Sequence, residues 1–463
     1  MSSAVLRNMF SPKSVALIGA SREPGKLGHI TLKNLIDGGF KGKIFPVNPE
    51  APEVLGLKAY PSVKNVADEI DLAVVTVPAV LVPSVMRECG EKGIEVAIVI
   101  SAGFRETGPQ GDALEQETLK VAREGGTRIL GPNCLGIVDA SQCIDATISR
   151  VIDPKTLRTG NIAFVSQSGA FGASLYSWAQ GRGIGFDKLV SLGNMSDVDE
   201  SDVFEYLATD PKTRVIVMYM EGVKDGRKFM RTAKRVSAVK PIVIMKIGRS
   251  SRASQAAKSH TGALTGSSAI YDAAFKQSGV IKANNTTQMF DFAKAFATQP
   301  LPKGNRIVVV TNAGGPGVAA TDTCEQEGLE LAEIGDDTRR AIRALIPSFA
   351  SALNPVDTTP QVSPTISGEI LRILLSQDSV DGAISIIVGS KPRKYAEEVV
   401  SAHLTVAKTC GKPLLLSWTA DKSAEDLVTG LEESGVPVYE TPERAVESMG
   451  ALRKYAEFLR TRM

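Results

Sequence analysis

The sequence lacks the features that mark several large classes of protein. Its 463 residues include five cysteines, an odd number, and no CxxC pair, so the sequence predicts neither a disulfide framework nor a zinc site. A reducing, cytoplasmic location is therefore expected. No run of 18 apolar residues occurs and the first residues carry no signal-peptide pattern, so we expect no membrane span.

Charge and aromatic content argue against nucleic acid and membrane surfaces as partners. The 53 Lys and Arg against 51 Asp and Glu give a formal net charge of +2, and aromatic residues make up 5% of the chain. Such a chain offers no strong field for a phosphate backbone and few rings on which bases could stack. It also has no GxxxxGK[ST] loop and no acidic cluster suited to magnesium-bound ATP. We expect no nucleic acid, no membrane and no metal on this chain.

Short apolar runs alternate with helical patterns over the first 145 residues. The runs lie at 14–18, 44–47, 72–77, 96–100 and 128–130, and helical patterns lie at 27–36, 81–91 and 111–124. Continuous apolar strands that alternate with helices are typical of a parallel sheet with both faces covered. We therefore expect α/β architecture that begins with a doubly wound, Rossmann-like domain at 1–145.

An internal repeat organises the rest of the chain. Residues 161–175 (NIAFVSQSGAFGASL) resemble residues 306–320 (RIVVVTNAGGPGVAA), and an offset of 145 residues pairs their glycines without a gap. Two copies of one α/β unit are the simplest account. We expect two flavodoxin-like, doubly wound domains at 146–298 and 304–463, joined by the linker TQPLPKGN.

The first strand is followed by a glycine-rich turn, GASREPGKLGH, that leads into a helix. Free backbone N–H groups in such a turn can bind a phosphate, although a purely structural tight turn gives the same pattern. The second strand ends PVNPE, without the acid at the strand end that would hold an NAD ribose, which disfavours NAD. In an open parallel sheet, the loops after the strands gather at one rim where ligands bind. The residues expected at this rim include Gly19, Val77, Pro78, Ser101, Ala102 and Asn133.

One of the three histidines, His260, stands in a long stretch of small and polar residues, RSSRASQAAKSHTGALTGSSA at 249–269. The second copy of the repeat has no such loop. A neutral imidazole nitrogen is nucleophilic near neutral pH, so His260 is a candidate nucleophile, with a solvated loop histidine as the alternative.

Glu221 follows the apolar run VIVMYM, and the matching position of the second copy is Val388. A carboxylate at a strand end can hold one imidazole nitrogen and leave the other to attack. The copy that has the histidine loop thus also has the acid, which favours a working pair. An ordinary carboxylate at the rim of the sheet is the alternative.

Two repeated turns each join a strand to a helix, and each leaves unpaired N–H groups and a partial positive charge at a helix N-terminus. We expect both turns to stabilise one phosphoryl group, although two ordinary βα turns would give the same sequence pattern. The residues are Ser168, Gly169 and Ala170 in the first copy and Gly314, Gly315 and Gly317 in the second. The sequence thus predicts a chain that carries a phosphoryl group without binding the nucleotide that supplies it.

Together these motifs resemble the α subunits of ADP-forming acetyl-CoA synthetases, the nucleoside-diphosphate-forming acyl-CoA synthetases of the succinyl-CoA synthetase superfamily. Residues 1–298 resemble the α subunit of succinyl-CoA synthetase, and residues 304–463 resemble the domain that closes its β subunit. The matching motifs are the turn from Gly19, GPNCLG (131–136), VSQSGA (165–170), YMEG (219–222), SHTGA (259–263), TNAGGPG (311–317) and NPVDTTP (354–360).

The resemblance implies the reaction acyl-CoA + ADP + phosphate ⇌ carboxylate + CoA + ATP, through an acyl phosphate and a phosphohistidine at His260 held by Glu221. It implies an ATP-grasp β subunit in an α2β2 heterotetramer, with Mg²⁺ and ADP or ATP bound on that partner. The residues that it places around CoA or acetyl-CoA are Ser21, Arg22, Gly25, Lys26, Val47, Asn48, Pro49, Ile100, Ser101 and Ala102. A succinyl-CoA synthetase-like ligase for another acid and a non-catalytic CoA-binding regulator are the alternatives.

Overall fold

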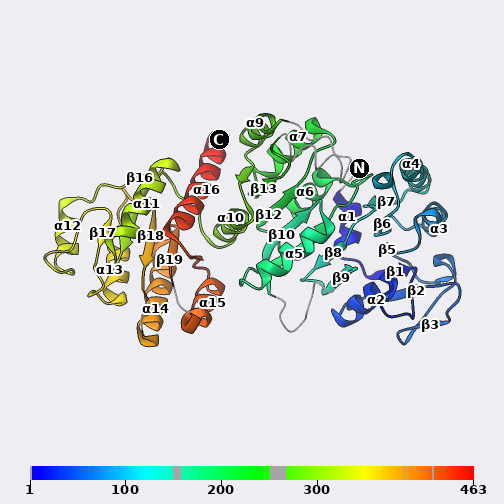
Figure 1. The fold of residues 1–463 in the computed structure, drawn as a ribbon, viewed down its shortest axis with the longest axis horizontal. Helices are drawn as coiled ribbons and strands as arrows, with labels where there is room; N and C mark the ends of the chain where they lie inside the picture. The colour runs from blue at the N-terminus through cyan, green and yellow to red at the C-terminus, as the bar shows by residue number, and fades with distance from the viewer. Residues whose placement is uncertain (1–2, 150–157, 251–266, 390–391, 420–421, 463) are drawn as a thin grey trace. The chain divides into compact units, whose positions relative to one another are not determined.

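The computed structural model describes residues 3–149, 158–250, 267–389, 392–419 and 422–462 (Figure 1). His260 and the rest of the stretch 251–266 lie outside the described residues. The chain divides into two compact units, Met1–Lys282 and Ala283–Met463. Each is described by itself.

The first unit opens with a five-stranded parallel sheet in the order β2-β1-β5-β6-β7. Its strands are β1 (Ser14–Ile18), β2 (Lys43–Val47), β5 (Leu72–Val75), β6 (Val96–Val99) and β7 (Arg128–Leu130). The helices that follow are α2 (Leu27–Asp37), α3 (Val82–Lys92) and α4 (Pro109–Glu124), after a first helix α1 (Ser3–Phe10). A short hairpin, β3 (Glu53–Val54) with β4 (Leu57–Lys58), and the 3₁₀ turns η1 (Val63–Asn65), η2 (Ala79–Leu81) and η3 (Arg105–Thr107) complete this part.

Both faces of this first sheet are buried, as the continuous apolar strands predict. Val15 and Leu17 of β1 belong to one hydrophobic cluster, together with α1 and α2. Ala16 and Ile18 belong to another, together with α3 and α4. Because side chains of a strand alternate between faces, an all-apolar strand requires helices on both sides. The predicted Rossmann-like fold is confirmed.

A seven-stranded sheet follows in the order β14-β13-β12-β10-β11-β8-β9. Its strands are β8 (Gly136–Asp139), β9 (Ile144–Thr147), β10 (Thr159–Ser166), β11 (Phe186–Ser191), β12 (Val215–Met220), β13 (Ile242–Lys246) and β14 (Ile281–Ala283). Its helices are α5 (Gly169–Gln180), α6 (Glu200–Thr209), α7 (Gly226–Val236) and α9 (Ser268–Ser278). The hairpin of β8 and β9 precedes residue 148, yet it pairs antiparallel with β11 and so extends this second sheet. The predicted boundary at residue 145 stays a prediction.

The second unit holds a six-stranded parallel sheet in the order β16-β15-β18-β19-β20, with β17 also paired to β15. Its strands are β15 (Arg306–Thr311), β16 (Glu330–Leu331), β17 (Val356–Asp357), β18 (Gly382–Ile387), β19 (Leu414–Trp418) and β20 (Val438–Tyr439). Its helices are α10 (Thr286–Thr298), α11 (Gly314–Gln326), α12 (Asp336–Arg343), α13 (Pro364–Leu375), α14 (Arg393–Cys410), α15 (Glu425–Glu433) and α16 (Pro442–Arg460), with the 3₁₀ turn η4 (Lys422–Ala424). The repeat is visible as two equivalent strand–turn–helix units, β10-α5 and β15-α11.

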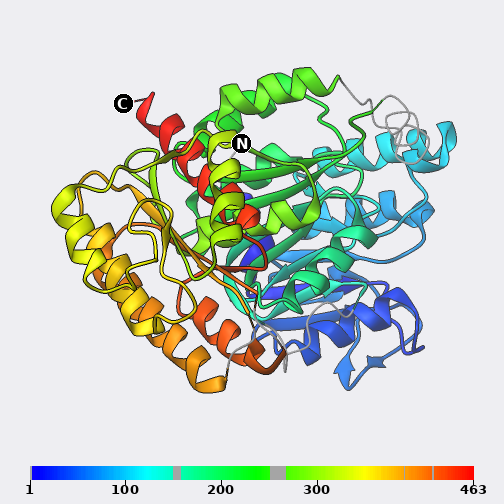
Figure 2. The ribbon, with the colours of Figure 1, turned by 60° about the vertical axis from the view of Figure 1, so that its left-hand side comes forward.

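Helix α10 is tied to α16, the last helix, and to α15 by one ion pair each, and it packs against α16. The Arg444 Nε atom lies 2.6 Å from Asp291 Oδ2. Lys294 Nζ lies 2.7 Å from Glu432 Oε1. α16 contacts both α10 and α11, and Figure 2 shows these helices side by side. The chain therefore crosses into the second compact unit before residue 298.

No helix in the described ranges is long and apolar enough to cross a membrane.

A buried ion cluster stabilises the edge of the seven-stranded sheet. Lys188 of β11 is 1% exposed, and its Nζ atom lies 3.2 Å from Asp139, 2.7 Å from Asp187 and 2.5 Å from Asp210. Burial alone would lower the pKa of Lys188, but the three carboxylates outweigh it and hold that pKa above its usual range. The cluster is therefore held together by its single cation.

We predict that Lys188→Met destabilises the chain by about 3–5 kcal/mol, since removing one partner leaves buried carboxylates without their counter-charge. Urea unfolding followed by circular dichroism measures the change. The matched control is Lys212→Met, at an exposed lysine, which should stay within about 0.5 kcal/mol of the parent. Equal unfolding midpoints for the two variants would show that the cluster contributes nothing.

Candidate active site

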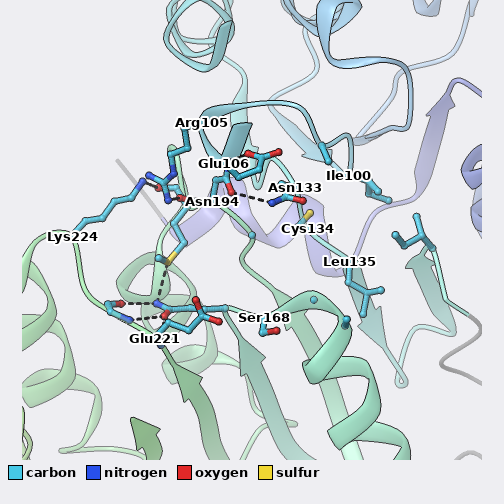
Figure 3. Close-up of a pocket in the computed structure, with 18 of the residues that line it drawn as sticks. Ile100, Arg105, Glu106, Asn133, Cys134, Leu135, Ser168, Asn194, Glu221 and Lys224 are labelled. Atoms are coloured by element: carbon cyan, nitrogen blue, oxygen red, sulfur yellow. Dashed lines mark hydrogen bonds between the residues drawn. The ribbon is translucent and has the colours of Figure 1, made fainter. Parts of the chain in front are cut away.

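A cavity of about 940 Å³ lies in the first unit, where loops of its two sheets meet (Figure 3). Most loops in its wall follow the carboxyl end of a parallel strand. Leu27 and Asp112 of two helices, and Ile148 and Ser149 after the antiparallel β9, also line it. The five-stranded sheet contributes the loops after β6 and β7, and the seven-stranded sheet contributes the loops after β10, β11 and β12. The predicted site residues that line it are Ile100, Ala102, Asn133, Ser168, Gly169, Ala170 and Glu221.

Glu221 is the first residue after β12, so its carboxylate stands at the carboxyl end of that strand. Its backbone N–H donates to Gln167 Oε1 at 2.5 Å, and the N–H of Gly222 donates to the same oxygen at 2.9 Å. The side chain is half-buried and faces the cavity beside Ser168 (Figure 3). This places an acid next to the turn that begins α5.

The turn that begins α5 leaves backbone N–H groups without a side-chain cap. Ser168 occupies the N-cap position and makes no capping hydrogen bond. Ser166 Oγ instead accepts from the Ser168 N–H at 3.2 Å and donates to its carbonyl at 2.7 Å. A Cβ atom on Gly172 would lie 2.6 Å from Ser166 Oγ, so this glycine allows the close approach of helix and strand.

The turn that begins α11 in the second unit is built in the same way. Thr311 Oγ1 accepts from the Ala313 N–H at 3.1 Å and donates to its carbonyl at 2.8 Å, and Ala313 makes no side-chain cap. A Cβ atom on Gly317 would lie 3.1 Å from Thr311 Cγ2. The predicted glycine turn Gly314-Gly315 thus presents an uncapped helix N-terminus of its own.

The first glycine turn owes its glycines to close packing. Gly19 has φ +93°, and a Cβ atom on Gly28 would lie 1.9 Å from the Gly19 carbonyl oxygen. Asn48 Nδ2 donates to the Ala20 carbonyl at 2.7 Å, while its Oδ1 accepts from the N–H of Glu50 at 2.8 Å. Asn48 therefore shapes two loops of the rim. These contacts bring the start of α2 against the end of β1.

The remaining predicted rim residues lie at strand ends, outside the cavity wall. Ser101 Oγ donates to the Val77 carbonyl at 2.5 Å, which ties two neighbouring loops together. Lys26 is paired with Glu23 at 2.9 Å on the surface. The residues in this group are Gly19, Ser21, Arg22, Gly25, Lys26, Val47, Asn48, Pro49, Val77, Pro78 and Ser101.

One polar cluster in the cavity wall was missed by the sequence motifs. Asn194 Nδ2 donates to Glu106 Oε2 at 2.7 Å and to Glu115 Oε2 at 2.9 Å, and the Asn194 carbonyl accepts from Arg105. Desolvation alone would raise the pKa of Glu106, but hydrogen bonds from Asn194 and from three backbone N–H groups outweigh it and lower that pKa. These residues come from η3, α4 and the loop after β11, and no short motif joins them.

Lys224 is a further residue of the cavity wall that no sequence motif indicated. Its Nζ donates to the Met195 carbonyl at 2.6 Å, and Figure 3 shows the side chain extending toward Arg105. Although the residue as a whole is exposed, its ammonium lines the cavity. Desolvation there, with repulsion from Arg105, lowers the pKa of Lys224 to about 8. The only local signal is its place three residues after Glu221.

The described residues contain no group of three or more His, Cys, Asp or Glu side chains arranged to hold a metal ion.

Three protein-family models match successive parts of the chain. A CoA binding domain matches residues 13–140, a succinyl-CoA ligase like flavodoxin domain matches residues 159–296, and a ligase-CoA domain matches residues 307–461. Each range contains most strands of one of the three large sheets described above.

Whole-chain relatives show the same order of domains. The α subunit of acetate–CoA ligase [ADP-forming] II of Pyrococcus furiosus is 42% identical over 98% of both chains. Acetate–CoA ligase [ADP-forming] I of Archaeoglobus fulgidus is 42% identical over 98% of this chain, which spans 64% of that longer protein. The structure of the acetyl-CoA synthetase 1 of Ca. Korarchaeum cryptofilum, in complex with phosphate and ADP, matches with a TM-score of 0.92 and 37% identity over 99% of both chains.

The fold, the cavity and these matches define a ligase that forms carbon–sulfur bonds, built on a CoA-binding domain and two ligase domains. The chain belongs to the family of ADP-forming acetate–CoA ligases and corresponds to their α subunits.

We predict that Lys224 reacts with an amine-selective acylating reagent at pH 8 about tenfold faster than Lys228, measured by mass spectrometry of the labelled peptides. A pKa near 8 leaves about half of the Lys224 amines neutral, whereas an ordinary lysine near 10.4 is almost fully charged. Lys228 is the matched control because it pairs with Asp199 at 2.8 Å and its pKa is raised. Equal labelling rates would contradict the lowered pKa.

Proposed function

We propose that this chain is the α subunit of an ADP-forming acyl-CoA synthetase that catalyses acyl-CoA + ADP + phosphate ⇌ carboxylate + CoA + ATP. One observation carries the proposal. Glu221 and the uncapped turn Ser168-Gly169 share a single cavity with Ile100, Ala102 and Asn133 of the CoA-binding domain. Acyl-CoA and a phosphoryl acceptor can therefore meet in one cavity.

The first chemical step is attack of a phosphate oxygen on the thioester carbonyl. The carbon–sulfur bond breaks, CoA leaves as a thiol, and an acyl phosphate forms. The His260 imidazole then attacks phosphorus, which releases the carboxylate and leaves a phosphohistidine. Transfer of that phosphoryl group to ADP gives ATP and restores the free histidine.

The cavity supplies the electrostatic support for the middle step. The N-terminus of α5, with Gly169 and Ala170 at its start, presents N–H groups and the positive end of a helix dipole to the phosphoryl oxygens. Glu221 accepts a hydrogen bond from the second imidazole nitrogen and so favours the imidazolium form that develops. We propose the same anion-stabilising role for the turn Gly314, Gly315 and Gly317.

We propose that CoA lies along the rim of the first sheet and reaches the cavity past Ile100 and Asn133. The glycine turn from Gly19 would bind its phosphates through backbone N–H groups at the start of α2. The residues proposed for the CoA contacts are Gly19, Ser21, Arg22, Gly25, Lys26, Val47, Asn48, Pro49, Val77, Pro78, Ile100, Ser101, Ala102 and Asn133. The proposed domains are the CoA-binding domain at 1–145 and the two ligase domains at 146–298 and 304–463.

A partner subunit completes the proposed enzyme. Two of the relatives are named α subunits, and a third continues past the matched part in one longer chain. We propose an ATP-grasp β subunit that binds ADP with Mg²⁺, in an α2β2 heterotetramer. The acid is identified by measuring thioester formation with acetate, longer acids and succinate.

We predict that incubation with acetyl-CoA and labelled phosphate labels His260 in an acid-labile, base-stable manner. Glu221→Gln should lower the rate of labelling by about 10²- to 10⁴-fold, because the imidazole loses its acid–base partner, while CoA binding stays intact. Glu124→Gln, at the exposed end of α4, is the matched control and should label normally. Labelling of His260→Ala equal to that of the parent chain would contradict the proposed phosphohistidine.

We also predict that this chain makes no ATP without its partner. Purified chain with acetyl-CoA, phosphate and Mg-ADP should show no turnover in a coupled ATP assay, since its sequence has no phosphate loop for a nucleotide. Adding the β subunit should restore turnover. Sustained ATP production by the pure chain would refute the proposed division of labour.

A further inference from the structure

The carboxamide of Gln167 is hydrogen-bonded at both ends to the turn that carries Glu221. Its Oε1 accepts from the N–H groups of Glu221 and Gly222 at 2.5 and 2.9 Å. Its Nε2 donates to the Gly222 carbonyl at 2.7 Å and contacts Met195 Sδ at 3.3 Å. Gln167 is 8% exposed, so little water competes for these bonds.

The second copy of the repeat has the same kind of tie at the equivalent position. Asn312, which the 145-residue offset pairs with Gln167, accepts from the N–H of Val388 at 2.9 Å and donates to its carbonyl at 3.1 Å. Val388 in turn stands where the first copy has Glu221. A carboxamide after one strand thus binds the first residue after the neighbouring strand in both copies. Only in the first copy does that bound residue carry an acid.

The far side of the Glu221 turn is held as well. Lys224 Nζ donates to the Met195 carbonyl at 2.6 Å, and Met195 adopts φ +50°, a left-handed conformation that is uncommon for a side chain of its size. Gln167 Nε2 reaches the sulfur of the same methionine. The backbone that bears Glu221 is therefore held both by the end of β10 and by the loop after β11.

We infer that Gln167 is a positioning residue, which fixes the backbone of the Glu221 turn and so fixes where the Glu221 carboxylate stands in the cavity wall. The inference rests on the proposed function, because it concerns the acid that the proposed phosphohistidine step requires. Gln167 acts through the backbone of residues 221 and 222, without a chemical role of its own. A displacement of about 1 Å at a catalytic group can lower a rate by about 100-fold, so a tie of this kind matters for the rate.

The carboxamide is chemically specific for this task. Its oxygen must accept two N–H groups while its nitrogen donates to a carbonyl less than 3 Å away. A carboxylate would accept the two N–H groups but would repel the Gly222 carbonyl and add a charge beside Glu221. A methionine of similar length would leave both N–H groups buried without a partner.

The test compares Gln167→Met with Gln180→Met in the full-length chain, together with any subunit that copurifies. Gln180 is the matched control, since its carboxamide also binds one backbone segment at both ends, through the N–H and the carbonyl of Arg158 at 2.8 and 3.0 Å. It stands at the opposite end of α5, away from the cavity. We expect phosphohistidine formation from acetyl-CoA and phosphate to slow about 10- to 100-fold in Gln167→Met and to stay near the parent rate in Gln180→Met. The dissociation constant for CoA should be unchanged in both.

A double-variant cycle separates positioning from a loss of folding. If Gln167 acts through Glu221, adding Gln167→Met to Glu221→Gln should slow labelling by less than about threefold, because the group being positioned is already lost. Gln167→Asn keeps the carboxamide and should recover part of the rate. The inference would be overturned if the double variant slowed labelling by the product of the two single effects. It would also be overturned if folded Gln167→Met labelled at the parent rate. An unchanged rate in Glu221→Gln alone would instead overturn the role proposed for that acid.

Discussion

The requirement that both faces of each parallel strand be covered determines where chemistry can occur in this protein. Helices bury the two faces, as the split of β1 side chains between two hydrophobic clusters shows. Polar groups are then left to the ends of the strands, where the backbone no longer pairs. The cavity is lined by loops that follow β6, β7, β10, β11 and β12. Its acid and its helix N-terminus are there because the architecture provides no other place for them.

The two copies of the repeat separate what the fold needs from what the reaction needs. Both copies keep a hydroxyl that closes the turn, in Ser166 and Thr311, and a glycine that lets the helix approach the strand. Both also keep a carboxamide tie. These features satisfy backbone groups that would otherwise be buried without partners, so either copy would lose stability without them. The acid and the histidine stretch stand in one copy only, so the shared fold does not require them, and this supports the chemical role proposed for them.

Much of the fold could be predicted from the sequence because parallel strands buried on both faces give continuous apolar runs. The predicted runs at 14–18 and 128–130 coincide with β1 and β7 to the residue. The hairpin of β8 and β9 could not be predicted in the same way. Its strands are four residues each and contain buried aspartates, and β8 pairs antiparallel with β11, a strand that lies some 50 residues later. The burial of Asp139 depends on an ion pair with the distant Lys188, which no local pattern records.

The candidate site likewise has residues that local sequence patterns predict and residues that they do not. Glu221 and the turn at Ser168 follow strands within recognisable motifs, so their place at a sheet edge follows from sequence alone. Arg105, Asn194 and Lys224 are brought together by tertiary packing, from a 3₁₀ turn and two loops with no common motif. Short-range periodicity carries no information about which loops of two different sheets will meet.

The polar contacts between the two sheets of the first unit hold the walls of the cavity together. Asn194 of the second sheet bonds Glu106 and Glu115 of the first domain, and Arg128 of β7 lies 2.7 Å from Asp197. A hydrophobic cluster runs beneath them through both sheets. Such a packed interface does not deform gradually, so the rim of the CoA-binding domain and the Glu221 turn keep a fixed separation. In the proposed reaction a phosphate oxygen must reach the thioester carbon, and the histidine nitrogen must then reach phosphorus. Walls that keep a fixed separation favour both steps, because the bound groups are aligned without further loss of entropy.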